Sequence, residues 1–247
     1  MASRKTVIAF DLYGTLLSTE SIAEELAKHY GEDNARPLAA LWRRYQLEYT
    51  WRINSMGEYR PFSELTRAAL HHAAAEQGLA PPSPETADAL MRSYDALRAF
   101  PEVGSALDHL LLDRDSGKGV EAYVFSNGTV DMVANSVRSS PDLGPRAGRL
   151  FRALVTVDDE GLRCYKPDGR VYSHLMRRAG VEEGRESDVW VVSANPFDIV
   201  GARAAGLNAA FIDRAGKGWI DRLDEMRVPS VVTRGVDEAV RSILEKA

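Results

Sequence analysis

The chain has 247 residues, 45% of them hydrophobic and 27% charged, which suits a folded protein with a main domain and a smaller second one. Its net charge of -5 excludes a general attraction to nucleic acid or an anionic membrane, so an anionic substrate needs local cations. The single cysteine, Cys164, excludes a disulfide framework and a multi-cysteine metal site. The apolar run near the N-terminus is too short for a signal peptide or a membrane span, so we expect a cytoplasmic protein.

Short apolar runs alternate with helical patterns along most of the chain. The runs are rich in β-branched and aromatic residues, which is typical of strands buried on both faces. Amphipathic helical spacing separates them, for example over residues 103–111, 171–179 and 236–244. This alternation predicts an α/β fold with a doubly wound, Rossmann-like parallel sheet. The expected strands are residues 6–10, 122–125, 154–157, 189–192, 209–212 and 230–232.

One long stretch breaks the alternation and contains only helical patterns. Its expected helices are residues 21–30, 37–53, 62–77 and 84–97, with prolines marking the connection before the last one. The simplest arrangement inserts this stretch after the first strand as a helical cap. We therefore expect a cap of residues 19–97 and a core of residues 1–18 and 98–247. Residues 112–119 and 139–148 are expected to be exposed loops.

Polar residues follow the expected strands, where ligands bind in an open parallel sheet. Asp11 follows the first strand, close to Gly14 and Thr15, and an oriented carboxylate there can act as a covalent nucleophile or merely stabilise a turn. Ser126 and Asn127 follow the second strand. Their hydroxyl and amide groups suit an anion, and equally an ordinary strand-to-helix turn.

A lysine and a second aspartate follow the later strands. Lys166 can neutralise a catalytic carboxylate and keep it ionised, or it can be a solvated loop lysine. Asp198 lies in the first turn of the helix after the fourth expected strand. It can pair with the lysine, although on its own an interaction with the helix dipole is the favoured interpretation. Each feature is weak alone, whereas their order along the chain is specific.

The ordered motifs D-x-Y-G-T, S-N-G-T, K-P and S-x-N-x-x-D resemble the haloacid dehalogenase superfamily over nearly the whole chain. The resemblance implies a doubly wound core, an aspartate nucleophile and an inserted cap. Tyr13 replaces the general acid of the superfamily's phosphatases, and Ala194 replaces their Mg²⁺ ligand. In both replacements the chain resembles the L-2-haloacid dehalogenases of the superfamily. Residues 41–51, LWRRYQLEYTW, resemble the halide-binding helix of those enzymes, with Arg43 at the arginine position.

This resemblance implies hydrolytic dehalogenation of an L-2-haloacid to a D-2-hydroxyacid, with inversion, through an ester on Asp11. It implies no metal and no organic cofactor. The substrate carboxylate would bind to Ser126, Lys166 and nearby backbone N–H groups, and the halide would bind to Arg43 and Asn127. The implied catalytic residues are Asp11, Thr15, Arg43, Ser126, Asn127, Lys166, Tyr172, Ser193, Asn195 and Asp198. The implied substrate-binding residues are Leu12, Tyr13, Arg44, Leu47, Phe62 and Phe197.

Two departures from the family pattern leave substrate size and halide preference open. Arg44 stands where bacterial members often have Gln, and Phe197 where many have Trp. The expected partners are a small 2-haloacid and a halide ion, and the apolar cap helices permit a homodimer like that of related enzymes. Three alternatives remain: a related hydrolase opening another activated carbon bond, as in azetidine-2-carboxylate, a Mg²⁺-dependent phosphatase, and a non-catalytic binding protein on the same fold.

Overall fold

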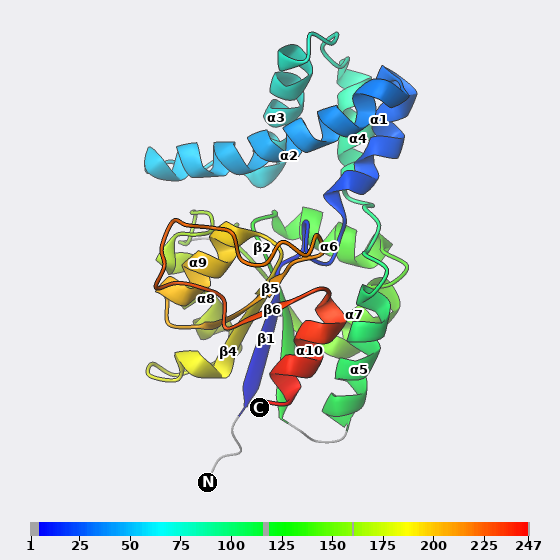
Figure 1. Ribbon diagram of the computed structural model, residues 1–247. Coiled ribbons are helices and arrows are strands. Elements are labelled where there is room, and N and C mark those ends of the chain that lie inside the picture. The colour runs from blue at the N-terminus through cyan, green and yellow to red at the C-terminus, as the bar shows by residue number, and fades with distance from the viewer. Residues whose placement is uncertain (1–4, 116–118, 160, 247) are drawn as a thin grey trace.

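A single parallel sheet organises the core of the computed structural model, which describes residues 5–115, 119–159 and 161–246 (Figure 1). Within these residues the strand order is β3-β2-β1-β4-β5-β6, and every neighbouring pair is parallel. The winding reverses between β1 and β4, and such a switch point is where ligands bind in open α/β sheets. The strands are β1 (Thr6–Phe10), β2 (Val120–Ser126), β3 (Phe151–Thr156), β4 (Val189–Ser193), β5 (Asn208–Ile212) and β6 (Val231–Thr233).

Helices cover both faces of this sheet. On one side lie α5 (Val103–Asp115), α7 (Gly144–Leu150) and α10 (Val236–Leu244), and on the other α8 (Gly169–Ala179) and α9 (Pro196–Ala204) (Figure 1). Helix α6 (Val130–Ser139) follows β2. Every residue of β1 and β4 is buried, as two-sided coverage requires.

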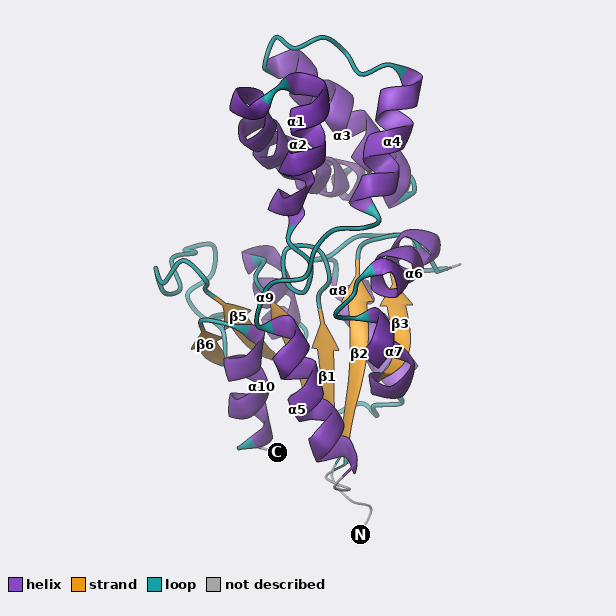
Figure 2. Cartoon of the chain, turned by 90° about the vertical axis from the view of Figure 1, so that its right-hand side faces the viewer, coloured by secondary structure: helices purple, strands orange, loops and turns teal. Residues whose placement is uncertain are grey.

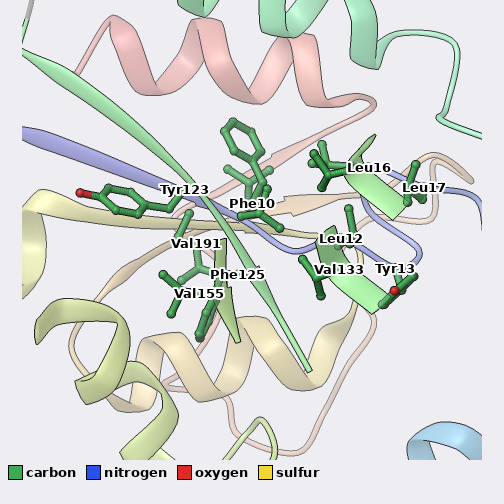
Figure 3. Packing of buried hydrophobic residues seen from close by; sticks show 14 of the residues in the cluster. Phe10, Leu12, Tyr13, Leu16, Leu17, Tyr123, Phe125, Val133, Val155 and Val191 are labelled. Carbon is green, nitrogen blue, oxygen red and sulfur yellow. The ribbon is translucent and has the colours of Figure 1, made fainter. Parts of the chain in front are cut away.

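The core between these layers consists of large apolar side chains from the central strands. Phe10, Phe125, Val155 and Val191 are at most 1% exposed, and they pack around the sheet in Figure 3. Burial of each such side chain contributes about 1.5–3 kcal/mol to the free energy of unfolding. The packed core therefore fixes the strand ends, from which the polar residues of the next section project.

Four helices and one 3-10 turn stand between β1 and α5 in the sequence, and they lie beyond the carboxyl ends of the strands (Figure 2). The chain enters and leaves this helical group through two segments that run side by side. Ser18 N donates to Arg98 O over 2.8 Å, and Phe100 N donates to Leu16 O over 3.1 Å. The elements are η1 (Thr19–Ile22), α1 (Ala23–Tyr30), α2 (Glu32–Ser55), α3 (Phe62–Glu76) and α4 (Pro84–Tyr94).

The six expected strands are confirmed, with bounds that shift by up to three residues. Two expected loops are partly helical. Helix α5 continues to Asp115, with Leu112 and Arg114 exposed in its last turn, and residues 116–118 of that expected loop lie outside the described residues. Helix α7 occupies residues 144–150, because Pro145 stands in its first turn, where proline is well tolerated.

The first long cap helix differs from expectation at its start. Helix α2 begins at Glu32 rather than at residue 37, so that Pro37 lies inside it. A proline costs a helix one backbone hydrogen bond, and here the rest of the 24-residue helix outweighs that loss. Helix α4 ends at Tyr94, three residues before its expected end. No helix in the described parts of the chain combines the length and apolarity needed to cross a bilayer.

Candidate active site

Asp11 lies directly after β1 at the switch point of the sheet. Its N–H donates to Val192 O over 3.0 Å, and Asp11 as a whole is only 6% exposed. Gly14 has φ +88°, a left-handed conformation that glycine adopts without strain, and this turn brings Thr15 back toward Asp11. Thr15 Oγ1 donates to Asp11 Oδ2 over 2.7 Å and accepts from Ala194 N over 2.9 Å. The turn therefore orients the carboxylate from two neighbouring strand ends.

Lys166 is buried between two carboxylates. Its Nζ donates to Asp11 Oδ1 over 3.2 Å, to Asp198 Oδ2 over 2.8 Å and to Phe125 O over 2.8 Å. Because an ammonium group has three N–H donors, all of them are used. The ammonium also lies 3.9 Å from the centre of the Phe125 ring, a favourable cation–π contact. Lys166 thus lies within hydrogen-bond distance of both Asp11 and Asp198, the two carboxylates with which its pairing was predicted.

The second carboxylate, Asp198, is fully buried and also bonded to a tyrosine. Tyr172 Oη donates to Asp198 Oδ1 over 2.9 Å. Burial raises the pKa of Asp198, and the Lys166 ammonium opposes that rise. Burial and the nearby Asp198 charge raise the pKa of Tyr172 well above its ordinary value, so its phenol stays neutral. A Cβ at Gly201 would overlap the Tyr172 ring, so glycine there lets the tyrosine approach.

Asn195 joins Asp11 to the loop that follows β1. Its Nδ2 donates to Asp11 Oδ2 over 2.7 Å and to Tyr13 O over 3.2 Å. Its N–H donates to the buried Ser193 Oγ over 3.1 Å. Asp11 Oδ2 therefore accepts two short hydrogen bonds, from Thr15 and Asn195, whereas Oδ1 accepts, among the described residues, only the longer one from Lys166.

The turn after β2 is also directed toward this site. Asn127 Oδ1 accepts from Lys166 N over 3.0 Å, which ties the lysine loop to β2. Ser126 Oγ is buried and accepts from Gly128 N over 3.1 Å, while Thr129 caps α6 by accepting from Met132 N. Thr129 thus fits the helix-capping interpretation, and anion binding by Ser126 and Asn127 stays a prediction.

One cation reaches the site from the helical group. Arg43 of α2 donates from Nη2 to Tyr13 O over 3.0 Å and to Asn195 Oδ1 over 3.5 Å. Since Asn195 also binds Asp11, a single amide separates the guanidinium from the carboxylate. Arg43 therefore stands beside the predicted nucleophile, although 32 positions separate them in the chain.

Aromatic side chains form an apolar wall beside Asp11. The Tyr13 ring stacks on Phe62 with centroids 6.1 Å apart and lies 5.6 Å from Tyr94. Burial raises the pKa of Tyr13 well above its ordinary value, and its Oη is hydrogen-bonded to Ser136 Oγ at 3.1 Å, so the phenol stays neutral. Phe197 meets Trp51 of α2 edge to face at 5.6 Å. Figure 3 shows Leu12 and Tyr13 at this end of the sheet.

Three predicted substrate-binding residues are placed differently from the rest. The Arg44 side chain is 58% exposed and pairs with Glu76 on α3 at 3.2 Å, so the structure does not bring it to Asp11. Arg44 follows Arg43 by one position and so points to another side of α2, and its role in substrate binding stays a prediction. Leu12 is fully buried, and its carbonyl accepts three N–H groups of the turn. Leu47 is half-buried on α2.

Four residues that border this site lie outside the set predicted from the sequence: Gln46, Tyr94, Asn54 and Tyr165. Gln46 contacts Arg43, and Tyr94 contacts Gln46. Asn54 binds both backbone groups of Tyr165, the residue before Lys166. For Gln46 a signal exists, because it follows Arg43 by three positions, where side chains meet on a helix. The other contacts depend on how the cap packs.

The donor set of this site fits Mg²⁺ poorly. Mg²⁺ prefers several oxygen ligands, whereas the ammonium of Lys166 binds both Asp11 and Asp198, and Ala194 supplies no side-chain ligand. In the ranges that the structure describes, no three His, Cys, Asp or Glu side chains form a group that could hold a metal ion.

A separate surface cleft lies where the helical group joins the core. It has a volume of about 710 Å³. Its lining comes from η1, α1, α2 and the returning chain: Ser18, Glu20, Ser21, Ala23, Glu24, Glu32, Ala35, Arg36, Ala39, Ala40, Arg98, Ala99, Phe100 and Pro101. None of the predicted site residues lines it, so the chemistry of the strand ends locates the site better than cavity size does.

Known proteins share both the sequence pattern and this architecture. The model of the haloacid dehalogenase-like hydrolase family matches residues 5–206. The chain belongs to this family. Among curated relatives, (S)-2-haloacid dehalogenase 1 of Pseudomonas sp. (strain CBS-3) is 36% identical over 84% of each chain. (S)-2-haloacid dehalogenase 4A of Burkholderia cepacia is 33% identical over 84% of this chain and 82% of that enzyme.

A solved structure supports the same family. The L-2-haloacid dehalogenase of Xanthobacter autotrophicus, with chloropropionic acid covalently bound, is 25% identical to this chain. It superimposes with a TM-score of 0.82 over 98% of this chain and all of that one. The doubly wound fold predicted from the strand pattern is therefore confirmed, and the family predicted from the strand-end motifs is confirmed with it.

Proposed function

We propose that this family member hydrolyses L-2-haloacids to D-2-hydroxyacids, with Asp11 as the nucleophile. The observation that carries the proposal is the buried Asp11 carboxylate, bound by Lys166 and approached by Arg43 through Asn195. The (S)-2-haloacid dehalogenase relatives, at 36% and 33% identity, support the same reaction. In this proposal residues 19–97 form a cap that closes over a small 2-haloacid.

In the first step, Asp11 attacks the carbon that carries the halogen. Its Oδ1 accepts one hydrogen bond and Oδ2 accepts two, so Oδ1 has the freer lone pair. The new bond joins Oδ1 to carbon 2 of the substrate while the carbon–halogen bond breaks, and the halide leaves with the bonding pair. Attack opposite the leaving group inverts carbon 2, and the product is an ester on Asp11.

Two anionic groups need stabilisation during this step. Ser126 and the backbone N–H groups beside Leu12 and Tyr13 bind the substrate carboxylate, and Arg43 with Asn127 stabilises the departing halide, where charge develops in the transition state. All three donors of Lys166 are used by protein oxygens. Lys166 therefore serves first as the hydrogen-bond and charge partner of Asp11, and it binds the substrate only by exchanging one of these contacts.

In the second step, water hydrolyses the ester. The water oxygen adds to Cγ of Asp11, the bond between Oδ1 and Cγ breaks, and the 2-hydroxyacid leaves with Oδ1. The water oxygen restores the carboxylate, and the reaction releases one proton overall. Burial raises the pKa of Asp198, which makes it a better proton acceptor than an ordinary aspartate. Ser193, Asn195 and Tyr172 position this step.

The experiment that tests the function measures halide release from L- and D-2-chloropropionate with EDTA present. We expect release from the L isomer alone, with D-lactate formed in equal amount, and release at background for Asp11→Asn. Asp33→Asn makes the same change at an exposed position of α2 and should retain the wild-type rate. Undiminished release by Asp11→Asn would overturn the nucleophile. No release from this or larger L-2-haloacids would overturn the substrate class.

A further inference from the structure

The Arg43 guanidinium is surrounded by neutral oxygens. Its contacts are Tyr13 O at 3.0 Å, Gln46 Oε1 at 3.4 Å and Asn195 Oδ1 at 3.5 Å. Within the described residues, no Asp or Glu oxygen forms an ion pair with it inside 4.0 Å. Arg44 and Arg52 of the same helix, in contrast, pair with glutamates. Arg43 therefore has no direct ion-pair partner among the described residues, and the Asp11 carboxylate lies one amide away from it.

One of these oxygens belongs to a fully buried glutamine with partners on three helices. Gln46 Oε1 accepts from Tyr94 Oη of α4 over 2.8 Å, and its Nε2 donates to Thr66 Oγ1 of α3 over 3.0 Å. Trp42 Nε1 in turn donates to Thr66 O over 2.7 Å. Because Arg43 has only donors, these contacts hold the glutamine oxygen, not its nitrogen, toward the guanidinium.

The lengths of the Arg43 contacts matter for its chemistry. Only the bond to Tyr13 O lies in the usual hydrogen-bond range, and the contacts to Gln46 and Asn195 are long. A carboxylate in place of the Gln46 amide would form a stronger, charge-assisted bond with Arg43, which lies three positions earlier on the same helix. Such a pair would compete with any anion for the guanidinium, whereas the neutral amide orients it and leaves its charge available.

We propose that Gln46 is a positioning residue that directs Arg43 toward the departing halide while leaving the guanidinium unneutralised. It acts through Arg43 rather than by touching the substrate. The inference rests on the proposed dehalogenation, in which the halide carries away negative charge next to Arg43. It also explains why a polar group is buried at the junction of α2, α3 and α4, where an apolar side chain would pack without needing partners.

The test compares two substitutions that separate charge from shape. Gln46→Glu keeps the shape of the side chain and adds a carboxylate, whereas Gln46→Met keeps the approximate volume and removes the acceptor. Measurements of kcat and KM on L-2-chloro- and L-2-bromopropionate are combined with inhibition by added chloride. For Gln46→Glu we expect kcat on the chloro substrate to fall about 100-fold with little change in KM, as for loss of one transition-state donor. Chloride inhibition should weaken about tenfold in parallel, with a smaller loss for Gln46→Met.

The controls distinguish this inference from the proposed function. Gln77→Glu changes the only other glutamine of the sequence, at the end of α3, and should behave as wild type. Gln46→Glu as active as Gln46→Met would overturn the inference, because a role in shape alone favours the isosteric change. If Gln46→Glu does not fold, wild-type kcat and chloride inhibition in Gln46→Met would overturn it. No halide release by the wild type would instead overturn the proposed function, and the inference with it.

Discussion

At the scale of single residues, the site depends on one lysine shared by two buried carboxylates. Lys166 is 1% exposed and binds both Asp11 and Asp198. In Lys166→Met the two carboxylates would face each other without a cation. Removal of one partner from a buried ion pair costs about 3–5 kcal/mol of unfolding free energy. We expect this loss at pH 8 in urea unfolding, together with the loss of halide release.

The same substitution should have a defined dependence on pH. Burial raises the pKa of Asp198, Lys166 opposes this, and Asp11 adds to the rise, so removal of the lysine raises that pKa further. A carboxyl with a raised pKa binds a proton more readily in the folded state, so its cost to stability is absent at low pH and grows as pH rises. The difference from wild type should therefore shrink from pH 8 to pH 5. An equal difference in unfolding free energy at both pH values would contradict this. The control Lys217→Met changes an exposed lysine and should leave the unfolding free energy as in wild type at both pH values.

The residues at strand ends could be predicted from the sequence, and those on the cap only partly. Parallel strands bring their carboxyl ends to one edge, so Asp11, Lys166 and Asp198 had to lie close together once the strands were known. On a helix, however, consecutive side chains point in directions about 100° apart. Which of Arg43 and Arg44 faces the core is decided by how α2 packs on α3 and α4, and the sequence pattern does not contain that packing.

At the scale of elements, apolar runs predicted the strands well because both sheet faces are buried. The helices were harder to bound, because polar residues on a solvent-facing last turn, as in α5, look like a loop in the sequence. Pro145 and Pro37 were read as breaks in helical structure, although both lie inside helices. A proline marks a break only where the helix needs its N–H group, and neighbouring helical residues can outweigh one lost bond.

The contact between the end of α2 and the loop before α8 gives a prediction at this scale. Asn54 Nδ2 donates to Tyr165 O over 2.7 Å, and Tyr165 N donates to Asn54 Oδ1 over 2.9 Å. Asn54→Ala removes both bonds, each worth about 1 kcal/mol. A loss of about 2 kcal/mol lowers the equilibrium constant between the closed and the open position of the cap roughly 30-fold. We expect faster amide exchange in residues 161–168 and a lower kcat, since Lys166 follows Tyr165.

A matched substitution separates this effect from general damage to α2. Asn34 lies in the same helix and donates to Tyr30 O, a bond that stays inside the cap. Asn34→Ala should leave exchange in residues 161–168 and kcat unchanged. Unchanged exchange in Asn54→Ala would mean that other contacts, such as the stacking of Tyr59 on Tyr165, suffice to hold the cap.

At the scale of the whole molecule, one arginine joins both chain segments that lead to the cap. Arg214 follows β5, and its Nη2 donates to Thr15 O over 2.8 Å and to Glu102 Oε1 over 2.6 Å. Its guanidinium also lies 3.5 Å from the centre of the Phe100 ring. Thr15 precedes the cap and Phe100 follows it, so this side chain fixes the point where the cap leaves the core.

Loss of Arg214 should therefore weaken the fold and the site together. For Arg214→Leu we expect a decrease of about 3 kcal/mol in the free energy of unfolding, from the lost charge-assisted bonds. Activity should fall as well, because Thr15 orients Asp11 through its hydroxyl. Urea unfolding and halide release measure the two effects, with the exposed Arg222→Leu of the same loop as control. A stable but inactive Arg214→Leu would assign the arginine to the site alone. An active but destabilised one would show that Asp11 keeps its orientation without this junction.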